Sequence, residues 1–247
     1  LLPNKYVPVG LKLDDTVDVF LYRDSEDRIV ATTITPKILL HQFATLEVKE
    51  VTTIGAFLDW GLEKDLFLPF VEQVTRVKKG DKVTVFLYLD ERTDRLVASA
   101  NVRDFAEENT TLKEGEEVDL LVDQESDLGF QVIINNKYIG LLFANEVFQP
   151  LSKGGRVKGF IKNIREDGKI DVSLQKQGYG QISDSQGLLL KKLQENEGVL
   201  YLTDKSDPDL IVQRMQMSKK VFKKAVGALY KQRKIKIESD RIVLIQK

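Results

Sequence analysis

Residues 86–99 read FLYLDERTDRLVAS and residues 20–32 read FLYRDSEDRIVAT, so the chain contains the same motif twice. In both copies two apolar stretches of strand-forming residues flank a charged turn, which is typical of a β-hairpin. A third, weaker copy follows at a constant offset of 74 residues, where Gly80, Val83, Phe86, Leu87, Leu96 and Ser99 return as Gly154, Val157, Phe160, Ile161, Ile170 and Ser173. A spacing of about 70 residues exceeds that of a solenoid repeat, so the sequence predicts a row of small β domains.

The second copy is the most complete, and its apolar pattern predicts five strands, at residues 46–51, 54–58, 66–69, 83–89 and 96–102. Five short antiparallel strands in about 65 residues fit a Greek-key barrel of the oligonucleotide-binding (OB) fold. Barrels of this kind bind single strands by stacking bases on exposed aromatic rings, while cationic side chains hold the backbone.

The first copy begins late, because Leu2-Pro3 corresponds to Leu68-Pro69 of the second copy and has no strand-rich stretch before it. From this comparison we expect on the order of 30 further residues in front of residue 1. The predicted domains are residues 1–40 as the C-terminal half of a first OB-fold domain, 41–111 as the second, 112–178 as the third and 179–247 as a winged-helix domain.

The composition excludes several function classes. The 247 residues are 42% hydrophobic and 30% charged, and no apolar run approaches the roughly 20 residues that cross a bilayer, which predicts a soluble, cytoplasmic protein with no membrane partner. The absence of Cys excludes Cys-ligated zinc, and the single His41 excludes a His-cluster metal site. Without a Gly-rich phosphate loop or a Ser–His or Cys–His arrangement, we expect no enzymatic activity and no cofactor. An Asp-only metal nuclease is the remaining enzymatic alternative.

Charge is distributed unevenly along the chain. Residues 41–111 carry a net charge of −4, whereas residues 180–247 carry 14 Lys and Arg against 8 Asp and Glu, a net charge of +6. A basic segment beside acidic ones is typical of a unit that binds a polyanion. We therefore expect a polyanionic partner for the C-terminal unit.

Four motifs follow one another in the second copy: IGAF at residues 54–57, LFLP at 66–69, KGDKVTV at 79–85 and RLVAS at 95–99. This order resembles the RNA-binding domain of the ribosomal protein S1 type. In that family the ligand surface consists of an aromatic pair on the second strand, a His at the end of the third, and an Asp and an Arg around the last turn.

The resemblance implies binding roles for Phe57, as the second aromatic residue, and for Asp90 and Arg95, as the polar pair. Ile54 stands at the first aromatic position, and the His position falls within Leu68-Pro69, so two of the usual contacts are absent. Alternatively, Phe57 is an ordinary barrel residue, since aromatic residues are common in strands for packing reasons alone.

The residues of the third copy can be matched to the same positions of the second copy. Phe130 matches Phe57. Arg165 stands near the acidic position, and Lys169 takes the place of Arg95. Basic residues near strand ends and turns make this copy the best candidate for a phosphate-binding barrel, and they are Lys153, Arg156, Lys158, Lys162, Arg165 and Lys169. The alternative is that Phe130 packs within the barrel and that the charges form a solvated face.

The C-terminal unit changes to a helical period. Its predicted elements are, in order, a helix over 186–196 capped by Ser183, a strand at 199–202, a helix from Pro208 to Met215, a helix capped by Ser218, and a hairpin of 235–237 with 242–244. This is the order of a winged helix. The predicted fold class is therefore mainly β with a C-terminal α+β unit, in which tandem five-stranded OB-fold barrels, the first truncated, precede a winged-helix domain.

The third helix separates charged from apolar residues. The residues within one arc of about 140° on a helical wheel are Lys219, Lys220, Lys223, Lys224, Gly227 and Lys231. Gly227 costs about 1 kcal/mol relative to Ala in a helix, so its place in the basic stripe indicates close backbone approach to a partner. The third helix of such a unit is the one that enters a groove, and Arg241 of the hairpin would add a phosphate contact. The alternative is a solvated charged face.

Residues 217–231 read MSKKVFKKAVGALYK. With the barrels before it, this stretch resembles the bacterial conserved virulence factor B family, and the resemblance covers the whole chain. It implies an RNA-binding regulator that controls virulence genes after transcription, with single-stranded RNA bound by the barrels and the basic winged helix. Two alternatives remain, a winged-helix transcription regulator that binds duplex DNA and an adaptor whose acidic barrels bind a ribosome or RNA-decay component.

Overall fold

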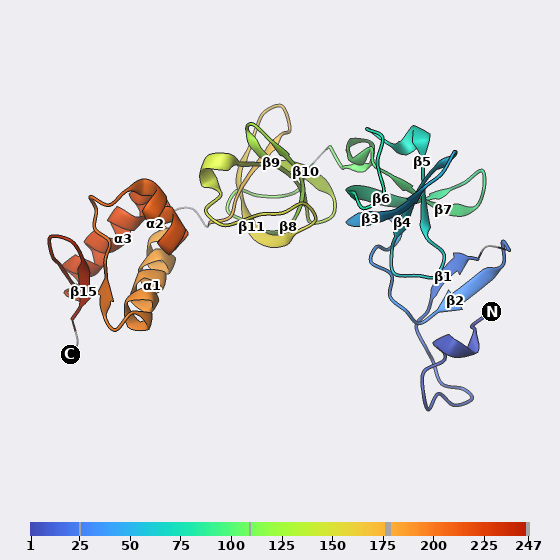
Figure 1. Cartoon of the computed structure of the whole chain (residues 1–247), viewed down its shortest axis with the longest axis horizontal. Helices are drawn as coiled ribbons and strands as arrows, with labels where there is room; N and C mark the ends of the chain where they lie inside the picture. Colours follow the sequence, from blue (N-terminus) through green and yellow to red (C-terminus); the bar gives the residue numbers. More distant parts are fainter. Residues whose placement is uncertain (25, 109, 176–178, 246–247) are drawn as a thin grey trace.

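The computed structural model describes residues 1–24, 26–108, 110–175 and 179–245, with side chains from residue 185 onward in the last range. Figure 1 shows the chain passing, in sequence order, from an N-terminal hairpin through two β-barrels to a helical C-terminal unit. The predicted fold class, mainly β with a C-terminal α+β unit, is confirmed. Within the described ranges, every helix is too short or too polar to cross a membrane.

The N-terminal residues form a hairpin that shares a core with the second barrel. Its elements are a 3-10 helix (Asn4–Tyr6) and the antiparallel strands β1 (Phe20–Arg23) and β2 (Ile29–Thr32). Trp60 of the second barrel packs edge-on against Phe20 and Tyr22, with ring centroids 5.6 and 6.3 Å away. Tyr22 and Trp60 are both buried in the same apolar cluster. The hairpin is therefore held against the barrel by large aromatic surfaces.

The second barrel has the five predicted strands. They are β3 (Phe43–Val51), β4 (Gly55–Asp59), β5 (Leu66–Pro69), β6 (Lys82–Asp90) and β7 (Arg95–Ser99), paired antiparallel in the order β5-β4-β3-β6-β7. A 3-10 helix, Phe70–Glu72, follows β5. Two predicted strand ends are wrong, because Ile54 lies before β4 and the last strand stops at Ser99. A 3-10 helix (Val102–Phe105) replaces the end of that strand.

The third barrel is closed. Its strands are β8 (Glu117–Ser126), β9 (Gly129–Ile134), β10 (Tyr138–Phe143), β11 (Arg156–Ile164) and β12 (Ile170–Ser173), and a 3-10 helix (Ala144–Glu146) follows β10. The barrel order is β10-β12-β11-β8-β9, in which only the β10–β12 pair is parallel. One parallel pair closing an antiparallel sheet matches the Greek-key barrel expected from the sequence.

Two glycines show how closely the repeats correspond. Gly55 and Gly129 are 74 residues apart and begin β4 and β9. A Cβ atom would lie 2.5 Å from the carbonyl oxygen of Leu68 at the first position and 2.1 Å from that of Leu142 at the second. Any side chain would collide with backbone there, so both strands require glycine to pair this tightly.

An inter-barrel joint connects the second and third barrels through His41, Phe43, Asn136 and Arg156. Asn136 Oδ1 accepts a hydrogen bond from the Phe43 amide at 2.6 Å, and its Nδ2 donates to the His41 carbonyl at 3.3 Å. Arg156 donates to the Phe43 carbonyl at 3.2 Å. An apolar cluster lies at the same place and contains Phe43, Phe86, Val102, Leu121 and Ile133. The joint therefore combines directional hydrogen bonds with apolar burial.

The C-terminal unit has the predicted winged-helix order. Its elements are α1 (Tyr179–Glu195), β13 (Val199–Leu200), α2 (Pro208–Met215), α3 (Lys219–Lys231), β14 (Ile235–Ile237) and β15 (Ile242–Leu244), with the strands in the order β13-β15-β14. The predicted cap at Ser218 is confirmed, since its Oγ accepts from the Val221 amide at 3.3 Å, and Asp207 caps α2 by accepting from the Asp209 amide at 2.8 Å. The predicted cap at Ser183 is wrong, because α1 begins at Tyr179. Ser costs at most about 0.7 kcal/mol inside a helix, so the helix continues through it.

Candidate nucleic-acid interface

The outer face of β4 and β5 carries a pair of aromatic rings. Phe57 pairs across the strands with Phe67, and their ring centroids are 5.3 Å apart with planes inclined by 38°. Both side chains are half-buried, whereas their neighbours Ala56, Leu58 and Leu68 are fully buried. Strand alternation therefore directs Phe57 and Phe67 to the opposite face from the core. Such a pair of rings is suited to base stacking.

Phe67 is a site candidate that the sequence analysis missed. The His position of the S1 type was assigned to Leu68 or Pro69, but Leu68 is fully buried. Phe67 is the residue directly opposite Phe57. The alternation of Leu66, Phe67 and Leu68 around a core of leucines was the signal that could have found it.

The segment after β5 adds further apolar surface. The Arg76 guanidinium lies 3.8 Å from the centre of the Phe70 ring, a cation–π contact. Val71 and Val74 are 84% and 68% exposed, and Ile54 before β4 is 62% exposed. This surface is more apolar than a solvated loop requires, which suggests a partner for it.

Asp90 and Arg95, the predicted polar pair, already have partners within the chain. Asp90 accepts from Thr93 Oγ1 at 2.7 Å and from the Arg92 amide at 3.2 Å, and these contacts, the Thr93 bond foremost, lower the pKa of its carboxyl group. Arg95 forms an ion pair with Asp27 of the N-terminal hairpin at 3.0 Å. Both residues therefore shape the β6–β7 turn and its contact with the hairpin, and their role in RNA binding stays a prediction.

The match of Phe130 to Phe57 is wrong in register. Phe130 pairs with Leu142 on β10, as Ala56 pairs with Leu68 on β5, and it packs against the core of the third barrel. The position of Phe57 is taken by Gln131, whose Nε2 donates to Asp123 at 2.8 Å. A shift of one residue moves a side chain to the other face of a strand, so Phe130 cannot play the part of Phe57.

Five of the six basic residues predicted for the third barrel have intramolecular partners, and Lys153 is the exception among the described residues. The ion pairs are Lys158 with Asp119 at 2.8 Å, Lys162 with Glu146, Arg165 with Asp171 at 2.7 Å and Lys169 with Asp167 at 2.6 Å. Arg156 belongs to the inter-barrel joint. The Asp119 contact raises the pKa of Lys158, and the Asp171 contact raises that of Arg165. A phosphate would have to compete with a carboxylate at four of these five positions.

Phe143 at the end of β10 is a second aromatic residue that the sequence analysis missed. Its ring centre lies 5.7 Å from Lys162 Nζ and 5.9 Å from the Arg165 guanidinium. The side chain is half-buried. A ring with two cations near it could hold a base and its phosphate together, which makes this end of the third barrel its best candidate surface.

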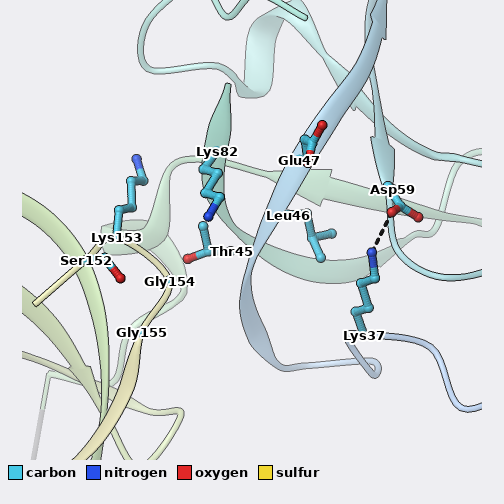
Figure 2. Close-up of a pocket in the computed structure, with 10 residues that line it drawn as sticks. All are labelled: Lys37, Thr45, Leu46, Glu47, Asp59, Lys82, Ser152, Lys153, Gly154 and Gly155. Carbon is cyan, nitrogen blue, oxygen red and sulfur yellow. Dashed lines mark hydrogen bonds and ion pairs between the residues drawn. The ribbon is translucent and has the colours of Figure 1, made fainter. Parts of the chain in front are cut away.

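A cleft of about 330 Å³ lies where the second and third barrels meet. Figure 2 shows Lys82 and Lys153 on its walls, with Lys37 paired to Asp59 at 2.5 Å. Neither Lys82 nor Lys153 has an acidic partner among the described residues. Glu47, which stands opposite Lys82 in the β3–β6 register without an ion pair to it, also lines the cleft. The cleft is therefore only weakly cationic.

Helix α3 differs from the barrels because its cations are free. Its buried face consists of Phe222, Ala225, Val226 and Leu229. Lys219 donates to the Ser206 carbonyl at 2.8 Å. The remaining predicted lysines are exposed and lack a carboxylate partner within the described part of the chain, and they are Lys220, Lys223, Lys224 and Lys231. The helix therefore presents a cationic face that no described carboxylate of its own unit neutralises.

The two remaining predicted positions behave differently. A Cβ atom on Gly227 would meet no atom within 4 Å, so the helix backbone is open there. Arg241 pairs with Glu238 at 2.7 Å, and Glu238 also contacts Lys236 at 3.3 Å. These two cations, Arg241 foremost, lower the pKa of Glu238. Arg241 is therefore less available to a phosphate than the lysines of α3.

The comparisons with known proteins agree with this architecture. Residues 187–244 match the sequence model of the CvfB-like winged helix domain, and residues 1–34 and 42–101 match that of the S1 domain, both of them domain types of nucleic-acid-binding proteins. The chain is 30% identical over 248 residues to uncharacterized protein YitL of Bacillus subtilis, covering 95% of this chain and 82% of the relative. It is 26% identical over 246 residues to conserved virulence factor B of Staphylococcus saprophyticus, covering 96% and 82%.

Among solved structures, the chain is similar to a Streptococcus pneumoniae multidomain protein with nucleic acid binding domains. The two are 25% identical, the match covers 99% of this chain and 89% of that one, and the TM-score is 0.40. The extent of the match to the Bacillus and Staphylococcus proteins, together with the winged-helix match, places the chain in one family. The chain belongs to the conserved virulence factor B family.

Proposed function

We propose that this chain binds single-stranded RNA in the cytoplasm and regulates gene expression after transcription, virulence genes included, without catalysing a reaction. The observation that carries the proposal is the row of exposed lysines on α3 that lack carboxylate partners in the described part of the chain. Lysines of this kind can neutralise phosphates and release their counterions. The S1 and winged-helix domain types support a nucleic-acid ligand, and the names of the Staphylococcus relatives support a link to virulence.

The barrels contribute aromatic rings to the proposed complex. Phe57 and Phe67 offer stacking surfaces on the second barrel, and Phe143 offers one on the third. Each contact is weak alone, but the overall affinity of several modules on one chain can exceed the affinity of any single module by orders of magnitude. Aromatic rings on OB folds stack on unpaired bases, so we expect the ligand to be single-stranded.

The test is a titration of labelled single-stranded RNA, single-stranded DNA and duplex DNA of equal length, at about 50 and about 200 mM salt. The test variant replaces Lys220, Lys223, Lys224 and Lys231 with Ala. The matched control replaces Lys5, Lys49, Lys137 and Lys192 with Ala, which removes the same charge from lysines that have carboxylate partners. We expect the test variant alone to lose affinity and to lower the salt slope by up to about 3, since each single-strand phosphate contributes about 0.7.

The nucleic acid that binds tightest decides between the regulators. Preference for single-stranded RNA supports the proposal. Preference for duplex DNA would instead assign the chain to transcription control through α3 in a major groove. Absence of binding to all three would contradict both regulators.

A second candidate function is a protein adaptor in translation or RNA decay. It is favoured by the exposed apolar residues of the second barrel, Ile54, Val71 and Val74, in a segment of net charge −4. We expect co-purification with ribosomes or decay enzymes that survives nuclease treatment and is lost in a Val71→Asp, Val74→Asp variant. Complete loss of co-purified proteins after nuclease treatment of the wild type would contradict an adaptor.

A further inference from the structure

Tyr230 is an aromatic residue within the cationic face of α3, near one edge of it. On a helical wheel it falls at about 20° from Lys219, between Lys219 and Lys223. Its side chain is 55% exposed, whereas Leu229 beside it is fully buried. A tyrosine ring with this exposure is not needed for the core of the unit.

Gly227 leaves a notch beside this ring. Residues three apart on a helix are neighbours on its surface, so the open backbone at Gly227 lies one turn before Tyr230. A Cβ atom on Gly227 would have no atom within 4 Å. A flat ligand on the exposed ring could therefore also touch the helix backbone at Gly227.

The notch is surrounded by positive charge. Lys223 precedes Gly227 by one turn, and Lys231 follows Tyr230, and both are exposed without a carboxylate partner within the described residues. Between Asp209 and Glu238 the sequence has no acidic residue at all. A ligand that fits must combine a flat apolar group with negative charge on either side, and a nucleotide base with its flanking phosphates has this chemistry.

We infer that the ring of Tyr230 and the notch at Gly227 bind one unpaired base of single-stranded RNA, with Lys223 and Lys231 contacting the adjacent phosphates. This inference rests on the proposed function and adds to it a base-stacking subsite on the winged helix. A base inside a duplex is covered on both faces by its neighbours, so it cannot lie against the ring. The subsite therefore favours single strands, although the same helix also presents a charge pattern suited to a groove.

The experiment compares an RNA oligonucleotide with the same oligonucleotide carrying abasic sites, which keeps every phosphate and removes the bases. The variants are Tyr230→Ala, Tyr230→Phe and Gly227→Leu in the full chain. The control is Tyr201→Ala, which removes another tyrosine of the same unit with 60% exposure. Circular dichroism and thermal unfolding of each variant check that the winged helix still folds.

We expect Tyr230→Ala to weaken RNA binding by about 5- to 150-fold, the usual range for loss of one stacked base, with an unchanged salt slope. Tyr230→Phe and Tyr201→Ala should bind like the wild type, and Gly227→Leu should lose affinity because it fills the notch. Abasic RNA should bind wild type and Tyr230→Ala equally.

Two results would overturn the subsite. In one, Tyr230→Ala binds intact RNA as the wild type does. In the other, it weakens abasic RNA or duplex DNA as much as intact RNA, which would assign the residue a contact to the backbone. Failure of the wild type to bind any RNA would be a different result, since it removes the proposed function as well.

Discussion

The third barrel and helix α3 are both rich in basic residues, but the barrel pairs most of its cations with carboxylates, whereas α3 does not within the described residues. Lys158 and Lys169 of the barrel each have a carboxylate within 2.8 Å, whereas Lys223 and Lys224 of α3 have none within the described residues. Exposed ion pairs contribute only about 0–1 kcal/mol to stability. Their larger effect here is on availability, because a paired lysine must leave its carboxylate before it can hold a phosphate. The number of basic residues in a segment is therefore a poor measure of its cationic surface.

The secondary structure explains the difference. Lys158 stands directly opposite Asp119 on the neighbouring strand, so a residue distant in sequence neutralises it. On α3 the neighbours at three and four positions are other lysines or apolar residues, and no acidic residue follows until Glu238. A lysine on a strand can find a carboxylate on a neighbouring strand of the sheet. A lysine on the outer face of a helix has as neighbours only the residues three and four positions away in its own helix.

The largest expected effect is on RNA affinity. Replacing Lys223 and Lys224 with Glu should weaken binding by on the order of 100-fold, because two free cations become two repelling anions. Replacing Lys158 and Lys169 with Glu changes the net charge equally but should cost less than about 3-fold in affinity. Fluorescence anisotropy of both variants at one salt concentration measures this. Equal losses of RNA affinity in the two variants would contradict the claim that the lysines of α3 are more available to phosphate than those of the barrel.

The next largest effect is on the stability of the third barrel. Asp171 is only 7% exposed and receives two hydrogen bonds from Arg165, at 2.7 and 3.1 Å. Arg165→Leu should destabilise the barrel by about 2 kcal/mol, because a buried carboxylate loses its partner. Lys169→Gln, whose partner is exposed, should cost about 0.5 kcal/mol or less. Hydrogen exchange of the β12 amides measures the stability of the third barrel in each variant. A larger loss of stability in Lys169→Gln than in Arg165→Leu would refute this ranking.

A smaller effect is expected inside α3 itself. Gly227→Ala should stabilise the winged helix by about 1 kcal/mol, since nothing lies within 4 Å of the added Cβ and Ala is the better helix former. Gly198→Ala is the matched control and should destabilise by about 1 kcal/mol or more, because Gly198 has φ +82°. Thermal unfolding of the two variants gives the comparison. Destabilisation by Gly227→Ala would mean that the notch is already filled.

The smallest expected effect is on pH dependence. The Lys169 contact lowers the pKa of Asp167 below its ordinary 3.8, so this pair stabilises the folded state above pH 3.8 and loses that contribution as pH falls through the lowered pKa. Lys169→Gln should therefore flatten the fall in melting temperature below about pH 4. Lys223→Gln on α3 should leave the curve unchanged. A change in the Lys223→Gln curve would reveal a carboxylate partner on the helix.

Much of the fold follows from local pattern. Alternating apolar residues and a charged turn identify hairpins wherever they occur, and the cap residues Asp207 and Ser218 mark two helix starts. The cap prediction at Ser183 was wrong because a residue that can cap a helix is also tolerated inside one. Whether such a residue caps the helix or lies within it depends on packing elsewhere in the chain. The prediction of strand ends was wrong for a similar reason. The last strand of the second barrel ends at Ser99, and a 3-10 helix follows it from Val102.

The site was less accessible from the sequence. The sequence analysis matched Phe130 to Phe57 by residue type, but the pairing of Phe130 with Leu142 assigns it to the core side. Such register depends on partners far along the chain. Two ion pairs of the third barrel also depend on residues distant in sequence, since Lys158–Asp119 joins two strands and Lys162–Glu146 joins a strand to a 3-10 helix. The exposed lysines of α3 were predictable because a helix face depends on nearby sequence alone, although the tyrosine among them was overlooked.

The inter-barrel joint has a consequence for how sequences of this family can diverge. Asn136 contacts only backbone atoms of His41 and Phe43, and Arg156 likewise binds a carbonyl. The side chain at position 41 can therefore change without disturbing these hydrogen bonds. Asn136 has no such freedom, because Asp would turn an acceptor toward the His41 carbonyl and Ala would leave the Phe43 amide without its partner. Substitutions should thus accumulate on one side of the joint while a single amide on the other side stays fixed.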